Sequence, residues 1–169
     1  KLAEKQQDAN NSATFEALFI GLAGAPLQET ARILAAETTA DTAKIKVLGV
    51  AAWNAPSVLK EPGLQRAWFA MPSVASHDSF VSRYTSTYGK APEPLASLAY
   101  DATALAVTLQ RGGQGFHAAA LENPAGFAGV DGVFRFLPNG QNQRNLSVVE
   151  IENGAVREVS PAPAQFYAW

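Results

Sequence analysis

The chain has 169 residues, of which 47% are hydrophobic and 17% are charged, and its net charge is −2. This length is enough for a folded domain with its own core. The small net charge without a basic stripe argues against nucleic-acid binding, and the lack of an apolar run of about 18 residues argues against a membrane span. Cysteine is absent from the sequence, which excludes disulfides, thiolate metal sites and cysteine catalysis.

The N-terminal residues carry little folding signal. The sequence begins at Lys1, without methionine and without an apolar signal region, and residues 1–14 are polar with no sustained period. We expect a processed or cut product whose targeting segment lies outside these residues. The polar stretch itself is typical of a linker, a frayed helix end or a truncation scar.

Three short apolar runs, 17–22, 45–50 and 66–71, are separated by more helical stretches. This pattern predicts a parallel sheet that is buried on both faces. Such sheets bind ligands in the loops that follow the strands. Here those loops, 23–25 and 51–54, contain no nucleophile, acid, base or metal ligand. The best-placed site is therefore expected to bind a ligand without reacting with it, or to bind nothing.

The helical stretches have recognisable boundaries. Pro26 suits a first helical turn, and a short helix is expected between Asn54 and Lys60. Around residue 76 several side chains are candidate helix caps, and Gly89 ends the helix that follows. That helix carries Phe80, Tyr84 and Tyr88 at four-residue spacing, and the strongest helix of the chain carries an apolar stripe of Leu95, Leu98, Ala99, Ala102, Leu105, Ala106 and Leu109.

The last part of the chain changes from helical to strand patterns. A short helix is expected around 116–121, and strands are expected at 133–136, 146–151 and 155–159. Asn153 and Gly154 separate the last two alternating runs, and this dipeptide is the strongest short signal for a β-hairpin.

Several groups of residues resemble reactive sites and have simpler explanations. Ser76, His77 and Asp78 contain the letters of a hydrolase triad, but adjacent side chains diverge, so helix capping explains the serine and the aspartate. His77 and His117 lack a second ligand at metal-binding spacing. The glycine-rich stretch 112–115 follows a helix instead of a strand, which predicts a helix stop and not a phosphate loop. Asp131, between two glycines, is expected in a turn.

Two aromatic residues, Trp53 and Tyr100, could either contact a ligand or pack in a core. Trp53 directly follows a predicted strand, where a ligand could stack on its ring. Tyr100 lies within the apolar helix, and its hydroxyl could face a cleft. For both residues, packing in a core is the alternative.

The order of these segments resembles a known family. The strand at 19–21, the helix at Pro26, the strand at 47–49 and the stretches 80–84 and 88–92 are similar to the later half of type I periplasmic binding proteins. The helix at 96–102 is that family's most recognisable element. Segments 61–65 and 129–136 look like the bacterial penicillin-binding protein activators, a group close to the leucine-type extracellular ligand-binding receptors.

The resemblance implies an α/β fold: a three-layer parallel-sheet lobe of a type I periplasmic binding protein with a C-terminal β-hairpin, and with the first lobe largely missing. It implies that residues 1–92 form a second-lobe segment. Residues 93–138 would then return to the first lobe, and residues 139–169 would form a hairpin that crosses back, followed by an extended tail. Because the stripe of the 95–109 helix would pack on a sheet outside this chain, we expect either the other half of the same receptor as a partner or self-association.

The resemblance also implies a ligand site in the cleft between lobes. Amino-acid binders of this family place an aromatic side chain in the first strand-end loop and an acid in the second, and both are absent here. Only Tyr100 matches a ligand-lining position of the family. The expected ligand-binding residues are Gly24, Ala25, Ala52, Trp53 and Tyr100.

Two functions remain as hypotheses, and neither requires a cofactor or a metal. The first is a non-catalytic periplasmic receptor of the solute-binding, branched-chain amino-acid ABC transporter type, for a ligand that is less cationic than an amino acid or is held mainly by the other lobe. The alternative is a penicillin-binding protein activator, a scaffold that contacts a cell-wall synthase and regulates peptidoglycan synthesis. Both imply a periplasmic location, with a lipid anchor in a segment outside these residues as one option.

Overall fold

The computed structural model of the chain describes residues 15–37, 42–93 and 95–166. Contacts along the chain divide it into two compact units. The first unit comprises the residues up to Met71 together with Val148–Val159, and the second comprises Pro72–Ser147 together with the residues from Ser160 onward. These units are defined by contacts within this chain. The lobe boundaries expected after residues 92 and 138 therefore stay predictions.

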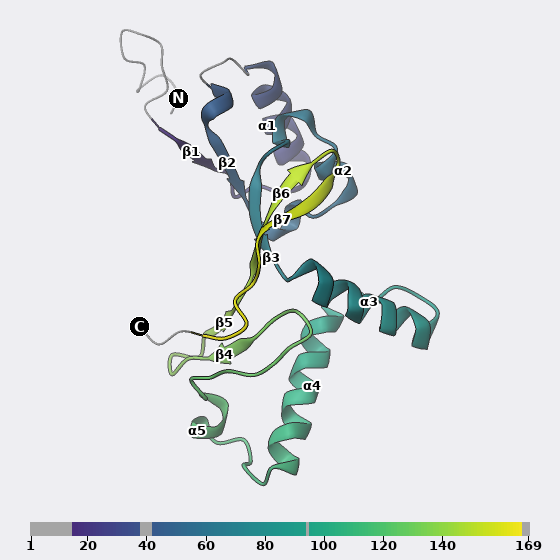
Figure 1. Cartoon of the computed structure of the whole chain (residues 1–169), viewed down its shortest axis with the longest axis vertical. Coiled ribbons are helices and arrows are strands. Elements are labelled where there is room, and N and C mark those ends of the chain that lie inside the picture. The colour runs from purple at the N-terminus through teal and green to yellow at the C-terminus, as the bar shows by residue number, and fades with distance from the viewer. Residues whose placement is uncertain (1–14, 38–41, 94, 167–169) are drawn as a thin grey trace. The chain divides into compact units, whose positions relative to one another are not determined.

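A five-stranded sheet in the order β1-β2-β3-β6-β7 organises the first unit (Figure 1). The three apolar runs predicted as strands form its first three strands, and β1 pairs parallel with β2 and β2 pairs parallel with β3. The predicted parallel pairing is thus confirmed for this half of the sheet. The predicted burial on both faces is wrong for β1, whose residues Ala17 and Phe19 are exposed because β1 is an edge strand. The strands are β1 (Ala17–Phe19), β2 (Lys46–Gly49), β3 (Trp68–Met71), β6 (Ser147–Glu152) and β7 (Ala155–Ser160).

The hairpin that completes the sheet has the predicted turn. Asn153 and Gly154 connect β6 to β7, and their φ values of 53° and 78° are both positive. Positive φ at both central residues defines the turn type that matches the twist of a two-residue hairpin. At the other side of β6, the Arg66 N–H donates to Ile151 O (2.8 Å), and the Ile151 N–H donates to Ala67 O (2.9 Å). With Arg66 at φ 69°, this pattern is that of a β-bulge, which increases the local twist of the sheet.

The buried face of the sheet packs on short helices. The helix α1 (Gly24–Ala36) buries Leu27 and Ala31. It lies directly against a single 3-10 turn, Pro62–Leu64, where a Cβ atom on Gly63 would come within 2.0 Å of Ala31 O. The core of this unit also includes residues of α2 (Pro56–Leu59), of the 3-10 turn and of the sheet: Val58, Leu59, Leu64, Phe69, Met71, Val149 and Ile151.

The second unit consists of three helices and a two-stranded sheet. Its small core of Leu105, Leu109 and Phe134 is surrounded by partly buried apolar side chains of the same unit. The predicted strand at 133–136 is confirmed, while its antiparallel partner β5 was not anticipated. The elements are α3 (Val74–Tyr88), α4 (Ala96–Arg111), α5 (Ala118–Leu121), β4 (Phe134–Phe136) and β5 (Asn142–Arg144).

One predicted helix start is wrong. The helix α3 begins at Val74 with Ser73 at its N-cap, so Ser76 and Asp78 lie inside the first turns and cap nothing. The predicted end is confirmed, because Gly89 adopts the left-handed conformation (φ 71°) that closes the helix. The polar residues around position 76 therefore indicated correctly that a helix begins in this region, but not the residue at which it begins.

The strongest predicted helix is confirmed as α4, and its apolar stripe divides into two parts. Leu105 and Leu109 are buried, whereas Leu95 and Leu98 keep 71% and 46% of their surface exposed. The C-terminal half of the helix thus packs within this unit, and the N-terminal half presents apolar side chains outward. Among the residues that the structure describes, no helix is long and apolar enough to cross a membrane.

Candidate ligand-binding site

The carboxyl ends of β1 and β2 lie at the same edge of the sheet, because these strands are parallel and in register. The chain leaves this edge through the loop before α1 and through a 3-10 turn at Ala51–Trp53. In open α/β sheets this edge is where ligands bind. The two loops therefore form the candidate ligand site of the first unit.

Trp53 holds the two loops together. Its side chain is completely buried, and its Nε1 donates a hydrogen bond to Leu22 O (2.9 Å) in the loop after β1. The indole lies so close to β2 that a Cβ atom on Gly49 would come within 2.4 Å of the ring. Of the two interpretations left open by the sequence, the structure places this ring in the core, beneath the loops.

Small residues form the exposed surface above Trp53. Gly24, Ala25 and Ala52 are all exposed, and Gly24 has a φ of 63°, which favours glycine. The N-cap of α1 is Ala23, whose side chain has no hydrogen-bonding group, so the first N–H groups of this helix receive no side-chain cap. Free N–H groups at a helix start favour a ligand atom with negative charge or a carbonyl oxygen. What the loops provide for binding is backbone, without acidic or basic side chains.

Tyr100 belongs to the second unit, on α4. Its ring is 49% exposed and meets the edge of the Phe80 ring at a centroid distance of 5.6 Å. Both interpretations of Tyr100, packing and ligand contact, therefore stay open, because one side of the ring packs against Phe80 and the rest is accessible. The ligand-binding roles of Gly24, Ala25, Ala52, Trp53 and Tyr100 stay predictions.

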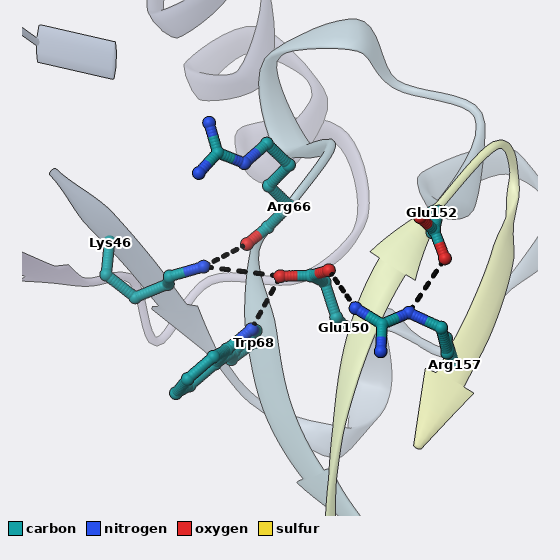
Figure 2. A network of polar contacts seen from close by, with 6 residues as sticks. All are labelled: Lys46, Arg66, Trp68, Glu150, Glu152 and Arg157. Atoms are coloured by element: carbon teal, nitrogen blue, oxygen red, sulfur yellow. Dashed lines mark hydrogen bonds and ion pairs between the residues drawn. The ribbon is translucent and has the colours of Figure 1, made fainter. Parts of the chain in front are cut away.

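A network of polar side chains that the sequence did not reveal lies on one face of the sheet in the first unit (Figure 2). Glu150 of β6 is at its centre. One carboxylate oxygen accepts hydrogen bonds from Trp68 Nε1 (2.8 Å) and Lys46 Nζ (3.3 Å), and the other accepts one from Arg157 Nη2 (2.7 Å). Arg157 also donates to Glu152 (2.8 Å), and Lys46 also donates to the Arg66 carbonyl (3.0 Å).

The surroundings of Glu150 favour its charged form. The hydrogen bond from Trp68, followed by those from Arg157 and Lys46, holds the pKa of Glu150 below its ordinary value, although partial burial acts in the opposite direction. Lys46 also lies 4.3 Å from the centre of the Trp68 ring, in a cation–π arrangement. Because these polar groups satisfy one another across four strands, the network holds the sheet together and leaves little for a ligand.

The sequence contained only a weak signal for this network. Glu150 lies between Val149 and Ile151, so the period of two places it on the opposite face of the strand from the core. Its partners lie up to 104 residues away in the chain, and only strand pairing brings them to it. Sequence patterns could locate the face of Glu150 and could not identify its partners.

A buried charge pair organises the second unit. Asp101 on α4 accepts a hydrogen bond from the Val130 N–H (2.8 Å), and its other oxygen lies 2.9 Å from Arg144 Nη1 in an ion pair without hydrogen-bond alignment. Both side chains are largely buried. A Cβ atom on Gly129 would come within 2.4 Å of the Asp101 carboxylate, so only glycine permits this close approach of the loop. The pair ties α4 to the 129–132 loop and to β5.

The histidine of the Ser76–Asp78 stretch pairs with a distant residue. His77 Nδ1 lies 2.9 Å from Asp131 Oδ1, and Asp131 is almost completely buried. Asp131 therefore anchors its loop to α3, which adds a tertiary contact to the turn position expected for it. Within the ranges that the structure describes, no three His, Asp or Glu side chains are grouped to hold a metal ion.

Comparison with known proteins identifies the fold. No protein-family model matches the sequence, and a search of curated proteins finds no match. Solved structures do match. A putative branched-chain amino acid ABC transporter protein from Rhodospirillum rubrum superposes with a TM-score of 0.70 at 24% identity, over 85% of this chain and 44% of that one.

Two further structures represent the two functions expected from the sequence. The leucine-binding protein LivK from Thermotoga maritima has a TM-score of 0.59 at 19% identity, over 87% of this chain and 44% of its own. The C-domain of LpoA from Haemophilus influenzae, described as a regulator of PBP1A, has a TM-score of 0.61 at 12% identity, over 94% of this chain and 47% of its own.

The chain thus has the α/β fold of one part of the type I periplasmic binding proteins, as the sequence resemblance indicated. It spans less than half the length of these solved structures. Both the solute-binding proteins and the PBP1A regulator are binding or regulatory proteins, and both functional hypotheses are compatible with the fold.

Proposed function

We propose that this chain is part of a non-catalytic, periplasmic ligand-binding receptor of the solute-binding ABC transporter type. The observation that carries the proposal is the strand edge above Trp53, where two loops expose glycine, alanine and an uncapped helix start. Gly24, Ala25 and Ala52 would let a ligand approach the backbone closely, and Trp53 would support them from below. Tyr100 is included among the proposed ligand-binding residues because it matches a ligand-lining position of the family that the sequence resembles.

The chemistry of these loops indicates the ligand class. An ammonium group that leaves water needs a charged or hydrogen-bonded partner. The loops 23–25 and 51–54 contain no carboxylate, while the helix start offers N–H donors. The proposed ligand is therefore a carboxylate or carbonyl compound that carries no ammonium group, or one whose ammonium is bound elsewhere in the intact receptor.

Isothermal titration calorimetry on the intact protein tests this proposal with two matched compounds, leucine and 4-methylpentanoate, which is leucine without its amino group. We expect 4-methylpentanoate to bind at least as tightly as leucine. The variant A52E adds a carboxylate at the edge and should shift the preference toward leucine. The variant S57E serves as the matched control, because Ser57 lies on α2, beyond the loops. Clearly tighter binding of leucine by the unchanged protein would show that its ammonium group is bound elsewhere in the intact receptor, and an equal shift in preference with A52E and S57E would contradict the proposed site at the loops.

A second function is supported by different observations. The fold match to the C-domain of LpoA covers 94% of this chain, and Leu95 and Leu98 expose an apolar surface on α4. A protein-binding scaffold that contacts a cell-wall synthase would use such surfaces and would need no small ligand. Capture of a purified peptidoglycan synthase by the intact protein, without a thermal shift for any amino acid or carboxylate, would favour this function.

The same exposed surface of α4 supports the proposed partner of the chain itself. The apolar side chains of Leu95 and Leu98 would be covered by the other half of the same receptor or by a second copy. Size exclusion combined with intact-mass measurement distinguishes these options, and a stable monomer of 17.9 kDa would contradict both. A lipid anchor in a further segment of the protein stays part of this proposal.

A further inference from the structure

The second unit contains a groove of ≈ 520 Å³ between α3 and α4. This volume lies within the range of about 300–1,000 Å³ that is typical of ligand pockets. It is separate from the strand-end loops, which belong to the first unit. Figure 1 shows the two helices that form its walls. The lining residues are Phe80, Arg83, Tyr84, Thr87 and Tyr88 of α3 and Ala96, Ala99, Tyr100 and Thr103 of α4.

Four aromatic rings follow one another along this groove. Tyr88 lies 4.6 Å from Tyr84, Tyr84 lies 5.9 Å from Phe80, and Phe80 lies 5.6 Å from Tyr100, measured between ring centres. Phe80 is buried and fixes the row, whereas Tyr88 is 64% exposed at one end. Rigid, exposed tyrosine rings beside small alanine residues offer contact area at little cost in side-chain entropy.

The polar groups of the groove favour a ligand that is rich in hydrogen-bond acceptors. Among the described lining residues Arg83 has the only charged side chain, and the phenol groups add further O–H donors. The hydroxyls of Thr87 and Thr103 already donate to carbonyls of their own helices, at 2.9 and 2.8 Å. The lining therefore combines aromatic rings, a guanidinium and phenols, without a carboxylate.

We infer that this groove binds an extended, proline-rich peptide segment of a partner protein. Such a segment forms a polyproline II helix, whose carbonyl groups are free and whose proline residues have no N–H to satisfy. Its rings and carbonyls match the aromatic row and the donors, and its stiffness limits the entropy lost on binding. Aromatic-lined grooves are the usual sites for these peptides. This groove shares Tyr100 with the ligand site of the proposed function, but the inference does not rest on the ligand proposed for the loops.

Amide NMR titration of the full chain tests the inference directly. The probe is a capped, uncharged peptide built from Pro-Pro-Leu repeats, and the control peptide has alanine in place of each proline. We expect saturable shift changes confined to residues 80–103 with the proline peptide and much weaker changes with the alanine peptide. Changes of equal size with both peptides, or changes that lie elsewhere, would overturn the inference.

Variants of the groove provide the second measurement. Y88A should weaken binding about tenfold because it removes an exposed anchor ring, and Y88F should weaken it less because it removes only the hydroxyl. F116A is the matched control, since Phe116 is 57% exposed in the same unit and does not line the groove. Equal effects of Y88A and F116A would overturn the inference. So would shifts at the groove with 4-hydroxyphenylacetate alone, which would identify a site for small aromatic anions instead.

Discussion

Two regions of the first unit use polar groups in opposite ways. On the sheet face, Glu150 is surrounded by Trp68, Lys46 and Arg157, and these groups satisfy one another. At the strand edge, the loops at Gly24 and Ala52 present no charged side chain and leave backbone groups accessible. The charged side chains thus stabilise the sheet, while the place suited to a ligand is nearly bare. A search for function by charged clusters alone would select the network of Glu150 and would pass over the proposed site at the strand edge.

The largest expected effect concerns the support beneath the loops. Trp53→Ala removes a fully buried ring and its hydrogen bond to Leu22, so we expect the free energy of unfolding to fall by about 3–5 kcal/mol. Urea denaturation measures this change. Phe19→Ala is the control, because Phe19 is 65% exposed and should cost less than about 1 kcal/mol. Equal losses would show that Trp53 is not a core residue.

A smaller effect is expected where β2 meets the same ring. Gly49→Ala places a methyl group within 2.4 Å of the indole, so either the ring or the strand must move. We expect a loss of about 1–3 kcal/mol in the free energy of unfolding. Gly21→Ala is the matched control in the loop after β1, since its added Cβ would meet only the Phe19 ring at 3.4 Å. Identical thermal unfolding curves for the two variants would contradict the close packing of Trp53.

The smallest effect concerns the network and depends on pH. Glu150→Gln keeps the shape of the side chain and removes its charge, with an expected loss of about 1 kcal/mol near pH 7. The folded-state pKa of Glu150 lies below its ordinary value of 4.5. Its contribution is therefore present above pH 4.5 and decreases as the pH falls through the lower folded-state pKa.

The difference in unfolding free energy between the unchanged chain and Glu150→Gln should accordingly shrink on acidification. Urea denaturation at neutral and acidic pH measures it. Glu152→Gln is the control, because Glu152 is half exposed and contacts Arg157 alone within the described network. A difference that stays constant with pH would show that the charge of Glu150 does not stabilise the sheet.

Particular elements show how far sequence reasoning reached. The apolar runs at 17–22, 45–50 and 66–71 predicted β1, β2 and β3 because short continuous apolar runs between helical stretches are typical of parallel strands. Asn153-Gly154 predicted the hairpin because the turn itself requires positive φ. The start of α3 was misplaced, since several polar residues in a row can each cap a helix and local sequence does not choose among them. The short strand β5 was missed because Asn142–Arg144 has no strand-like pattern of its own.

Local sequence specified the strands and helices other than β5, the hairpin and the absence of reactive side chains from the strand-end loops, because all of these depend on residues that are neighbours in the chain. The tertiary structure decided which residues meet. It placed Trp53 beneath the loops, joined Glu150 to Lys46, paired Asp101 with Arg144 and formed the aromatic groove of α3 and α4. These contacts join residues that strand pairing and helix packing bring together, and no local pattern records them.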